Sequence, residues 1–180
     1  MKILAFGASH SKTSINKRFA EYAAMELAGK DDKVNILDLN SFDVPLFTID
    51  VEKEKGYPES VYAFFQVFSE ADIIIISFAE HNGSYTASFK NLFDWASRIE
   101  PKIFQEKPTI LLSTSSGSRG GLSVLTAAID RMPRHGAKVL GHFALPFFYK
   151  NFEGDSLVNP EQKTAFGAFI NEIQSKLAQL

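Results

Sequence analysis

The sequence predicts an α/β fold in which helices cover both faces of a parallel sheet. Five short apolar runs alternate along the 180 residues with five segments of helical periodicity, and this alternation is typical of consecutive β-α-β units. Ile73 to Ile76 are consecutive β-branched residues, as expected of a central strand buried on both faces. The predicted strands are Lys2–Phe6, Val34–Leu37, Asp72–Phe78, Thr109–Ser113 and Lys138–Leu145.

Each intervening segment carries an apolar stripe with the i, i+3, i+4 spacing of a half-buried helix. The first three stripes are Ile15, Phe19, Tyr22 and Ala23; Val61, Phe64, Phe65 and Phe68; and Phe89, Leu92, Phe93 and Ala96. The last two are Leu122, Leu125, Ile129 and Met132; and Phe166, Phe169, Ile170, Ile173 and Leu177. Pro133 must close the fourth helix and Pro160 can begin the fifth. Gly56 and Pro58 in the mixed-charge stretch Asp50–Glu59 predict a surface loop.

The length and composition predict a single domain covering residues 1–180. They also favour a small molecule as its binding partner. The chain has no cysteine, which excludes disulfides, thiolate metal ligands and a thiol nucleophile. Its formal net charge is −2, with Lys and Arg spread along the sequence, so neither a nucleic acid nor an anionic membrane is an expected partner. No signal-peptide pattern and no apolar run of about 20 residues is present. We therefore expect a cytoplasmic protein, and we predict no metal site.

The loop after the first strand, Gly7–Asn16, is a candidate phosphate site. Sheets of this kind bind ligands beyond the carboxyl ends of their strands, at the switch point. Free N–H groups and the dipole of the following helix attract an anion, and short hydroxyls can wrap a terminal phosphate. The predicted contacts are Ser9, His10, Ser11, Ser14, Ile15 and Asn16, with Thr13 as a further donor. Alternatively, Ser14 only caps the helix; Asn16 could tie the loop back on itself.

Other nucleotide and hydrolase motifs are incomplete. Gly7 is followed five residues later by Lys12-Thr13, as in a P-loop, but the glycine that should precede the lysine is missing. A G-x-G-x-x-G fingerprint is absent, and no Gly-x-Ser-x-Gly elbow follows a strand. The sequence therefore disfavours nucleoside triphosphate hydrolysis and serine hydrolysis.

The segment Ala79–Trp95, after the third strand, contains Glu80, then Asn82-Gly83-Ser84, then Lys90-Asn91 and Asp94-Trp95. With these residues it resembles the second flavin-binding motif of the NADPH-dependent FMN reductases, a family of quinone, chromate and azo-dye reductases. Their pattern is close to Pro-Glu-Tyr-Asn-Gly-Ser, followed by Leu-Lys-Asn and Asp-Trp. It is matched at Glu80, Asn82, Gly83, Ser84, Lys90, Asn91, Asp94 and Trp95, and the family's phosphate loop is matched at Gly7, Ser9, Ser14 and Asn16. Two positions depart from the family pattern: Ala79 replaces its usual proline and His81 its usual tyrosine. His10 lies near the position where many relatives carry an arginine.

This resemblance implies a flavodoxin-like three-layer sandwich with strand order 2-1-3-4-5. It implies FMN as cofactor, NADPH or NADH as electron donor, and hydride transfer to a small electron-poor acceptor such as a quinone, an azo dye, free flavin or a metal ion. Because FMN carries the chemistry, we name no catalytic side chain. Relatives are usually dimers in which the FMN site lies near the subunit contact, so we expect a homodimer, with Asp50–Glu59 and Phe147-Phe148-Tyr149 as candidate contact or lid segments.

The loop after the fourth strand, Ser113–Gly121, is expected to approach the flavin ring. Its glycines allow a close approach of the backbone, and backbone donors with Arg119 would stabilise negative charge on the reduced flavin. The predicted ring contacts are Glu80, His81, Asn82, Gly83, Ser84, Ser115, Ser116, Gly117, Arg119 and Gly120. Alternatively, Ser118 is only a helix cap in a flexible loop.

Several motif residues could equally serve the fold alone. Trp95 is an ordinary core residue by its position, Lys90 and Asp94 have the spacing of a helical ion pair, and Asn82-Gly83 is a common turn dipeptide. Two other functions stay open: a flavodoxin-type carrier of single electrons, and a scaffold that has lost its cofactor.

Overall fold

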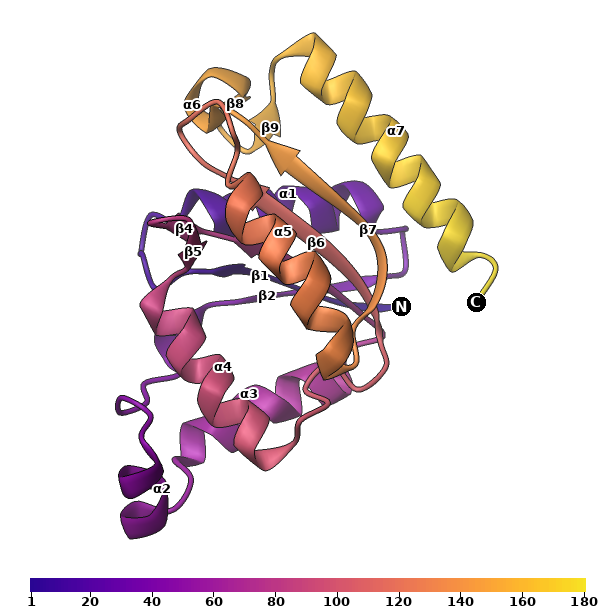
Figure 1. Ribbon diagram of the computed structural model, residues 1–180. Coiled ribbons are helices and arrows are strands. Elements are labelled where there is room, and N and C mark those ends of the chain that lie inside the picture. Colours follow the sequence, from indigo (N-terminus) through magenta and orange to yellow (C-terminus); the bar gives the residue numbers. More distant parts are fainter.

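The central sheet contains five parallel strands, and the computed structural model describes all residues 1–180. The strands are β1 (Lys2–Ala8), β2 (Lys33–Leu37), β3 (Ile73–Phe78), β6 (Pro108–Thr114) and β7 (Lys138–Leu145). Their order is β2-β1-β3-β6-β7 (Figure 1). This is the predicted order 2-1-3-4-5, and each strand lies within two residues of its predicted bounds.

Two helical layers sandwich the sheet, because side chains alternate along each strand and both faces are apolar. One face packs on α3 (Glu59–Glu70), α4 (Ala87–Ile99) and α5 (Leu122–Arg131), and the other on α1 (Ile15–Leu27) and α7 (Pro160–Leu177). In β3, for example, Ile74 and Ile76 belong to the first core, and Ile73 and Ile75 to the second. The three-layer prediction is confirmed.

Gly7 allows α1 to start directly against the sheet. A Cβ atom at Gly7 would lie 2.3 Å from the backbone nitrogen of Lys17 and 2.8 Å from the carbonyl carbon of Asn16. Only a glycine permits this approach, since real Cβ atoms do not come so close to backbone atoms. The first turn of α1 is thereby held at the carboxyl end of β1, where the phosphate loop was predicted.

The predicted loop at Asp50–Glu59 was wrong in part. It contains a two-turn helix, α2 (Ile49–Lys55), whose Thr48 cap accepts a hydrogen bond from the Val51 N–H. Acidic residues in the first turn and lysines in the last favour this helix through its dipole. The surface location was right, because α2 buries none of its residues and protrudes from the sandwich (Figure 1).

One helical stripe also differs from its prediction. Leu122 is exposed at the start of α5, and the helix buries Val124, Leu125 and Ala128. The α-helical part ends at Arg131 and a 3-10 turn, η2 (Met132–His135), carries Pro133, so the predicted stop is confirmed. None of the helices is both long and apolar enough to cross a membrane.

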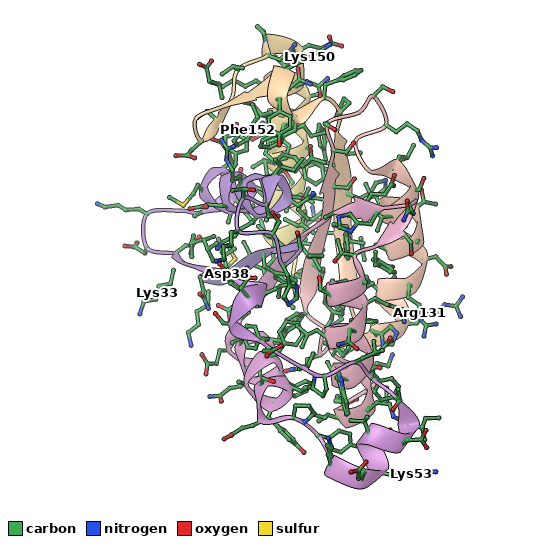
Figure 2. All side chains as sticks on the ribbon, turned by 90° about the vertical axis from the view of Figure 1, so that its left-hand side faces the viewer. Lys33, Asp38, Lys53, Arg131, Lys150 and Phe152 are labelled. Carbon is green, nitrogen blue, oxygen red and sulfur yellow. The ribbon has the colours of Figure 1, made fainter.

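Several short elements lie at the carboxyl end of the sheet. They are the hairpin β4 (Glu80–His81) and β5 (Ser84–Tyr85), the turn α6 (Phe148–Asn151), and the hairpin β8 (Phe152–Glu153) and β9 (Ser156–Leu157). A 3-10 turn, η1 (Leu39–Ser41), follows β2. Figure 2 shows Lys150 and Phe152 at one end of the molecule and Lys53 of α2 at the other. The α6 turn with the β8–β9 hairpin and the α2 helix are therefore remote from each other.

Candidate functional site

A polar cavity of about 290 Å³ lies at the carboxyl end of the sheet. It is lined by three segments that are far apart in the sequence and by one residue of α6. The lining residues are Ser9, Ser11, Thr13, Ser14, Ile15, Asn16, Ala79, Glu80, His81, Thr114, Ser115, Ser116 and Tyr149. The loops after β1, β3 and β6 thus meet at one place, as the switch-point rule predicted.

The first turn of α1 directs unpaired donors toward this cavity. The backbone N–H groups of Ile15 and Asn16 have no acceptor within the protein, which is normal for a first helical turn. Ser14 caps the helix, its Oγ accepting from the Lys17 N–H at 3.1 Å, and its own hydroxyl hydrogen stays available. The capping interpretation of Ser14 is confirmed, and it is compatible with a hydroxyl that also donates to a ligand.

Hydrogen bonds between residues of the loop itself fix the rest of its conformation. Ser9 Oγ accepts from the Ser11 N–H at 3.1 Å, and Ser11 Oγ accepts from the Thr13 N–H at 3.3 Å. These internal bonds orient the hydroxyls around the helix terminus. Backbone N–H groups, hydroxyls and a helix dipole form a donor set that fits a phosphate monoester. The residues present therefore fit the phosphate group of FMN.

Asn16 does not tie the loop back on itself. Its buried side chain reaches other strands: Nδ2 donates to the Thr114 carbonyl at 3.1 Å, and Oδ1 accepts from the Thr114 N–H at 3.0 Å and from Ser77 Oγ at 2.7 Å. Oδ1 accepts two hydrogen bonds and Nδ2 donates one, so the group that Asn16 offers most directly to a ligand is its backbone N–H, which has no acceptor within the protein. It fixes the start of α1 relative to β3 and β6.

The loop after β3 is a tight hairpin. Asn82 and Gly83 have φ of 52° and 77°, as the central pair of a type I′ turn requires, so the turn interpretation is confirmed. The Glu80 carboxylate accepts from the Val124 N–H at 3.0 Å. It therefore caps α5, whose N-cap position, Gly121, has no side chain. Ala79 and His81 line the cavity beside Glu80, and His81 is exposed.

The loop after β6 is shaped by its glycines. Gly120 and Gly121 have φ of 58° and 76°, and a Cβ at Gly120 would lie 2.8 Å from the carbonyl of Leu145. Gly120 is thus needed for packing against the end of β7. Arg119 extends along α5, donating to Ser123 Oγ at 3.1 Å, and is exposed.

Only some of the predicted cofactor-binding residues line the cavity. Ser9, Ser11, Ser14, Ile15, Asn16, Glu80, His81, Ser115 and Ser116 line it, whereas His10, Asn82, Gly83, Ser84, Gly117, Arg119 and Gly120 lie outside its wall. Ala79, Thr114 and Tyr149 line it without having been selected as ligand contacts. Thr114 directly follows the predicted strand Thr109–Ser113 and ends the observed β6, and Tyr149 was predicted only as part of a subunit-contact or lid segment.

The motif residues on α4 do not line the cavity. Trp95 is fully buried and its Nε1 donates to the Pro45 carbonyl at 2.8 Å. Asn91 Oδ1 accepts from the Phe47 N–H at 2.7 Å. Lys90 forms the expected ion pair with Asp94, at 2.7 Å. Asn91 and Trp95 thus anchor the segment that leads to α2, and the interpretation of Trp95 as a core residue is confirmed.

No lysine or arginine side chain lines the cavity. Burial lowers the pKa of His10, so its imidazole is neutral at pH 7, and its Nδ1 is buried without a partner. Lys17 is held by Asp38, with Nζ and Oδ2 2.7 Å apart, and this hydrogen bond lowers the pKa of Asp38 to about 2. A ligand phosphate would be bound mainly by neutral dipoles.

The fold and this site define a flavodoxin-like protein with a polar, hydroxyl-rich cavity at the switch point. The profile of the family described as NADPH-dependent FMN reductase matches residues 1–150. The chain belongs to this family of enzymes, whose cofactors are FMN and NADPH or NADH.

Relatives in sequence are named as quinone reductases. An NADPH:quinone oxidoreductase of Arabidopsis thaliana is 36% identical over 126 residues, which cover 68% of this chain and 62% of the relative. A quinone reductase of Escherichia coli K12 is 29% identical over 143 residues, covering 73% and 76%. A 2-hydroxy-1,4-benzoquinone reductase of a Burkholderia species is 32% identical over 121 residues, covering 67% and 63%. The chain thus spans less than two thirds of the Arabidopsis and Burkholderia relatives.

Solved structures confirm the fold. FerB of Paracoccus denitrificans, a flavoenzyme NAD(P)H:(acceptor) oxidoreductase, superposes with a TM-score of 0.78 at 20% identity, covering 97% of this chain and 95% of FerB. The azoreductase AzrA superposes with a TM-score of 0.62 at 15% identity, covering all of both chains.

Proposed function

We propose that this protein is an FMN-dependent NAD(P)H oxidoreductase that reduces a small electron-poor acceptor, with a quinone as the first candidate. The observation that carries the proposal is the hydroxyl-rich cavity at the first turn of α1, where Ile15 and Asn16 present unpaired N–H groups. The quinone is favoured by the names of the sequence relatives. Azo dyes, free flavin and metal ions remain further candidates.

The predicted cofactor contacts divide by position. Ser9, Ser11, Ser14 and the N–H groups of Ile15 and Asn16 would hold the phosphate. The β4–β5 hairpin and the loop 115–121 would flank the ring, through backbone groups where side chains are engaged elsewhere. His10, Asn82, Gly83, Ser84, Gly117, Arg119 and Gly120 remain proposed contacts, although they lie outside the cavity wall.

Bound FMN would supply hydride transfer between the nicotinamide and the acceptor. The residues of this chain would bind the cofactor and hold it in a fixed orientation. The cap from Glu80 to α5 fixes the hairpin, and Asn16 fixes the phosphate loop against β3 and β6. Such rigid positioning lowers the entropic cost of bringing two reactants together. No side chain is assigned as a proton donor.

We also propose that residues 1–180 act as one domain in a cytoplasmic homodimer. Phe148 is fully buried and cannot be a contact. Leu46, Ile49 and Tyr57 are exposed on and around α2, and this apolar surface supports a subunit contact there. Light scattering at micromolar concentration is expected to give the mass of a dimer, and a monomer would remove this proposal.

The deciding experiment is an anaerobic titration. Purified protein is mixed with FMN, and NADPH and then NADH are added while the oxidised flavin absorption is followed. Bleaching, then reoxidation by a quinone, is the expected result. Bound flavin that neither nucleotide reduces, and that accumulates a semiquinone with a chemical reductant, would identify an electron carrier. Absence of FMN binding would refute the function altogether.

A further inference from the structure

Tyr149 lies at the cavity although no motif includes it. It is 71% exposed, yet it contributes to the cavity wall, where it is the only phenylalanine, tyrosine or tryptophan. The other lining residues come from the loops after β1, β3 and β6. Tyr149 is thus a fourth, separate segment of the site.

The backbone around Tyr149 is fixed to the loop after β6. The Phe147 N–H donates to the Gly117 carbonyl at 2.9 Å, and the Phe148 N–H donates to the Ser115 carbonyl at 2.9 Å. Phe147 adopts φ of 46°, a left-handed conformation that is costly for a bulky residue and persists only where surrounding contacts impose it. Tyr149 is therefore mounted on a rigid turn.

Aromatic contacts place this turn beside the first turns of α1. The Arg18 guanidinium carbon lies 5.3 Å from the centroid of the Phe148 ring, and the Phe148 ring lies 5.6 Å from that of Tyr149. Arg18 also donates to the Gly154 carbonyl in the β8–β9 hairpin. Arg18 is one turn beyond Ser14, and Tyr149 lines the same cavity as Ser14.

The cavity wall lacks a cationic side chain, so a bound phosphate would need neutral hydrogen-bond donors such as the Tyr149 hydroxyl. A phosphate monoester carries up to two negative charges, and the cavity wall offers no lysine or arginine to meet them. Hydrogen bonds to charged groups are stronger than neutral ones. A phenol donates readily and stays neutral at physiological pH.

We propose that Tyr149 is a further FMN-binding residue whose hydroxyl donates to the phosphate. The proposal rests on the proposed function, since it requires FMN in this cavity. It assigns a cofactor contact to the segment after the last strand.

The test compares FMN with riboflavin, which lacks the phosphate. Binding is measured by quenching of flavin fluorescence for the wild type, Tyr149→Phe, and Tyr62→Phe as a control at an exposed tyrosine of α3. Tyr149→Phe should weaken FMN binding by about tenfold, the size of one hydrogen bond to a charged group. Its riboflavin affinity, and both affinities of Tyr62→Phe, should equal those of the wild type.

Three results would overturn the proposal. Unchanged FMN affinity in Tyr149→Phe means that the hydroxyl makes no contact, and equal losses for FMN and riboflavin mean that it does not act on the phosphate. An altered molar mass with unchanged FMN affinity would assign Tyr149 to a subunit contact. The wild type decides the proposed function separately: if it binds no FMN, both proposals fail, whereas binding that Tyr149→Phe leaves intact refutes only this one.

Discussion

Asn16 and Thr114 are joined by a pair of hydrogen bonds between a side-chain amide and a backbone peptide. Nδ2 donates to the Thr114 carbonyl, and Oδ1 accepts from the Thr114 N–H. The last β3–β6 register pair is Phe78 with Ser113, so Asn16 supplies hydrogen bonds one residue further along β6. An amide can do this because it carries the same donor and acceptor as a peptide.

Removing the Asn16 amide is expected to be strongly destabilising. Asn16→Ala leaves both polar groups of Thr114 and the Ser77 hydroxyl without their buried partner, so the free energy of unfolding should fall by about 2–4 kcal/mol. Urea denaturation measures it. Asn171→Ala, at an exposed position of α7, should change stability little; an equally small loss in Asn16→Ala would contradict the role assigned to the amide.

Two glycine-to-alanine substitutions should act in opposite directions. Gly7→Ala places a Cβ within 2.3 Å of the Lys17 nitrogen, so it should cost about 3 kcal/mol or more and displace α1. At Gly167 in α7 a Cβ meets no atom within 4 Å, so Gly167→Ala should stabilise by about 0.5–1 kcal/mol through helix propensity. Thermal melts of both variants check the pair, and a tolerated Gly7→Ala would refute the close approach.

A charge placed at Ser14 should separate folding from phosphate binding. Aspartate caps helices as well as serine does, so Ser14→Asp should keep its stability. Its carboxylate would repel a ligand phosphate, so FMN affinity should fall more than about tenfold and recover partly at high salt. Ser14→Asn, a neutral cap, is the matched control. Full FMN affinity in Ser14→Asp would place the phosphate elsewhere.

His135 should make stability depend on pH. It is buried, its Nδ1 lies 2.8 Å from the Pro101 carbonyl, and burial lowers its pKa from 6.5. The unfolded chain therefore binds a proton at a pH where the folded one does not, so the associated stability is complete above about pH 6.5 and is lost as pH falls below it.

The check is urea denaturation of His135→Gln at pH 7.5 and 5.5. The loss of stability on acidification should be smaller than in the wild type, while His142→Gln, at an exposed histidine, should keep the full loss. Identical pH dependence in all three proteins would show that His135 does not titrate as described.

The sheet was predictable because its strands are continuous apolar runs and its helices carry clear stripes. That the loop after β1 lines a polar cavity was also predictable, because a helix cap needs one hydroxyl and this loop concentrates several before the helix; its binding of a phosphate stays a prediction. The partners of Asn16 could not be inferred, since Ser77 and Thr114 are distant in sequence. Tyr149 was singled out only as part of a candidate subunit-contact or lid segment, because an exposed aromatic after a strand carries no signal that assigns it to the cavity. The α2 helix was missed because its charges resemble those of a loop.

The α2 helix has a consequence for local unfolding. It fully buries no residue. It is tied to the body by Val51, which is partly buried against the core, and by Glu52, which accepts from Arg98. Segments with so little buried surface open at low free energy, independently of the core. Its amides should exchange hydrogen early, and trypsin should cut first after Lys53 or Lys55, leaving the sandwich intact. Any partner that covers the exposed Ile49 would slow both processes, which makes α2 a sensitive reporter of association.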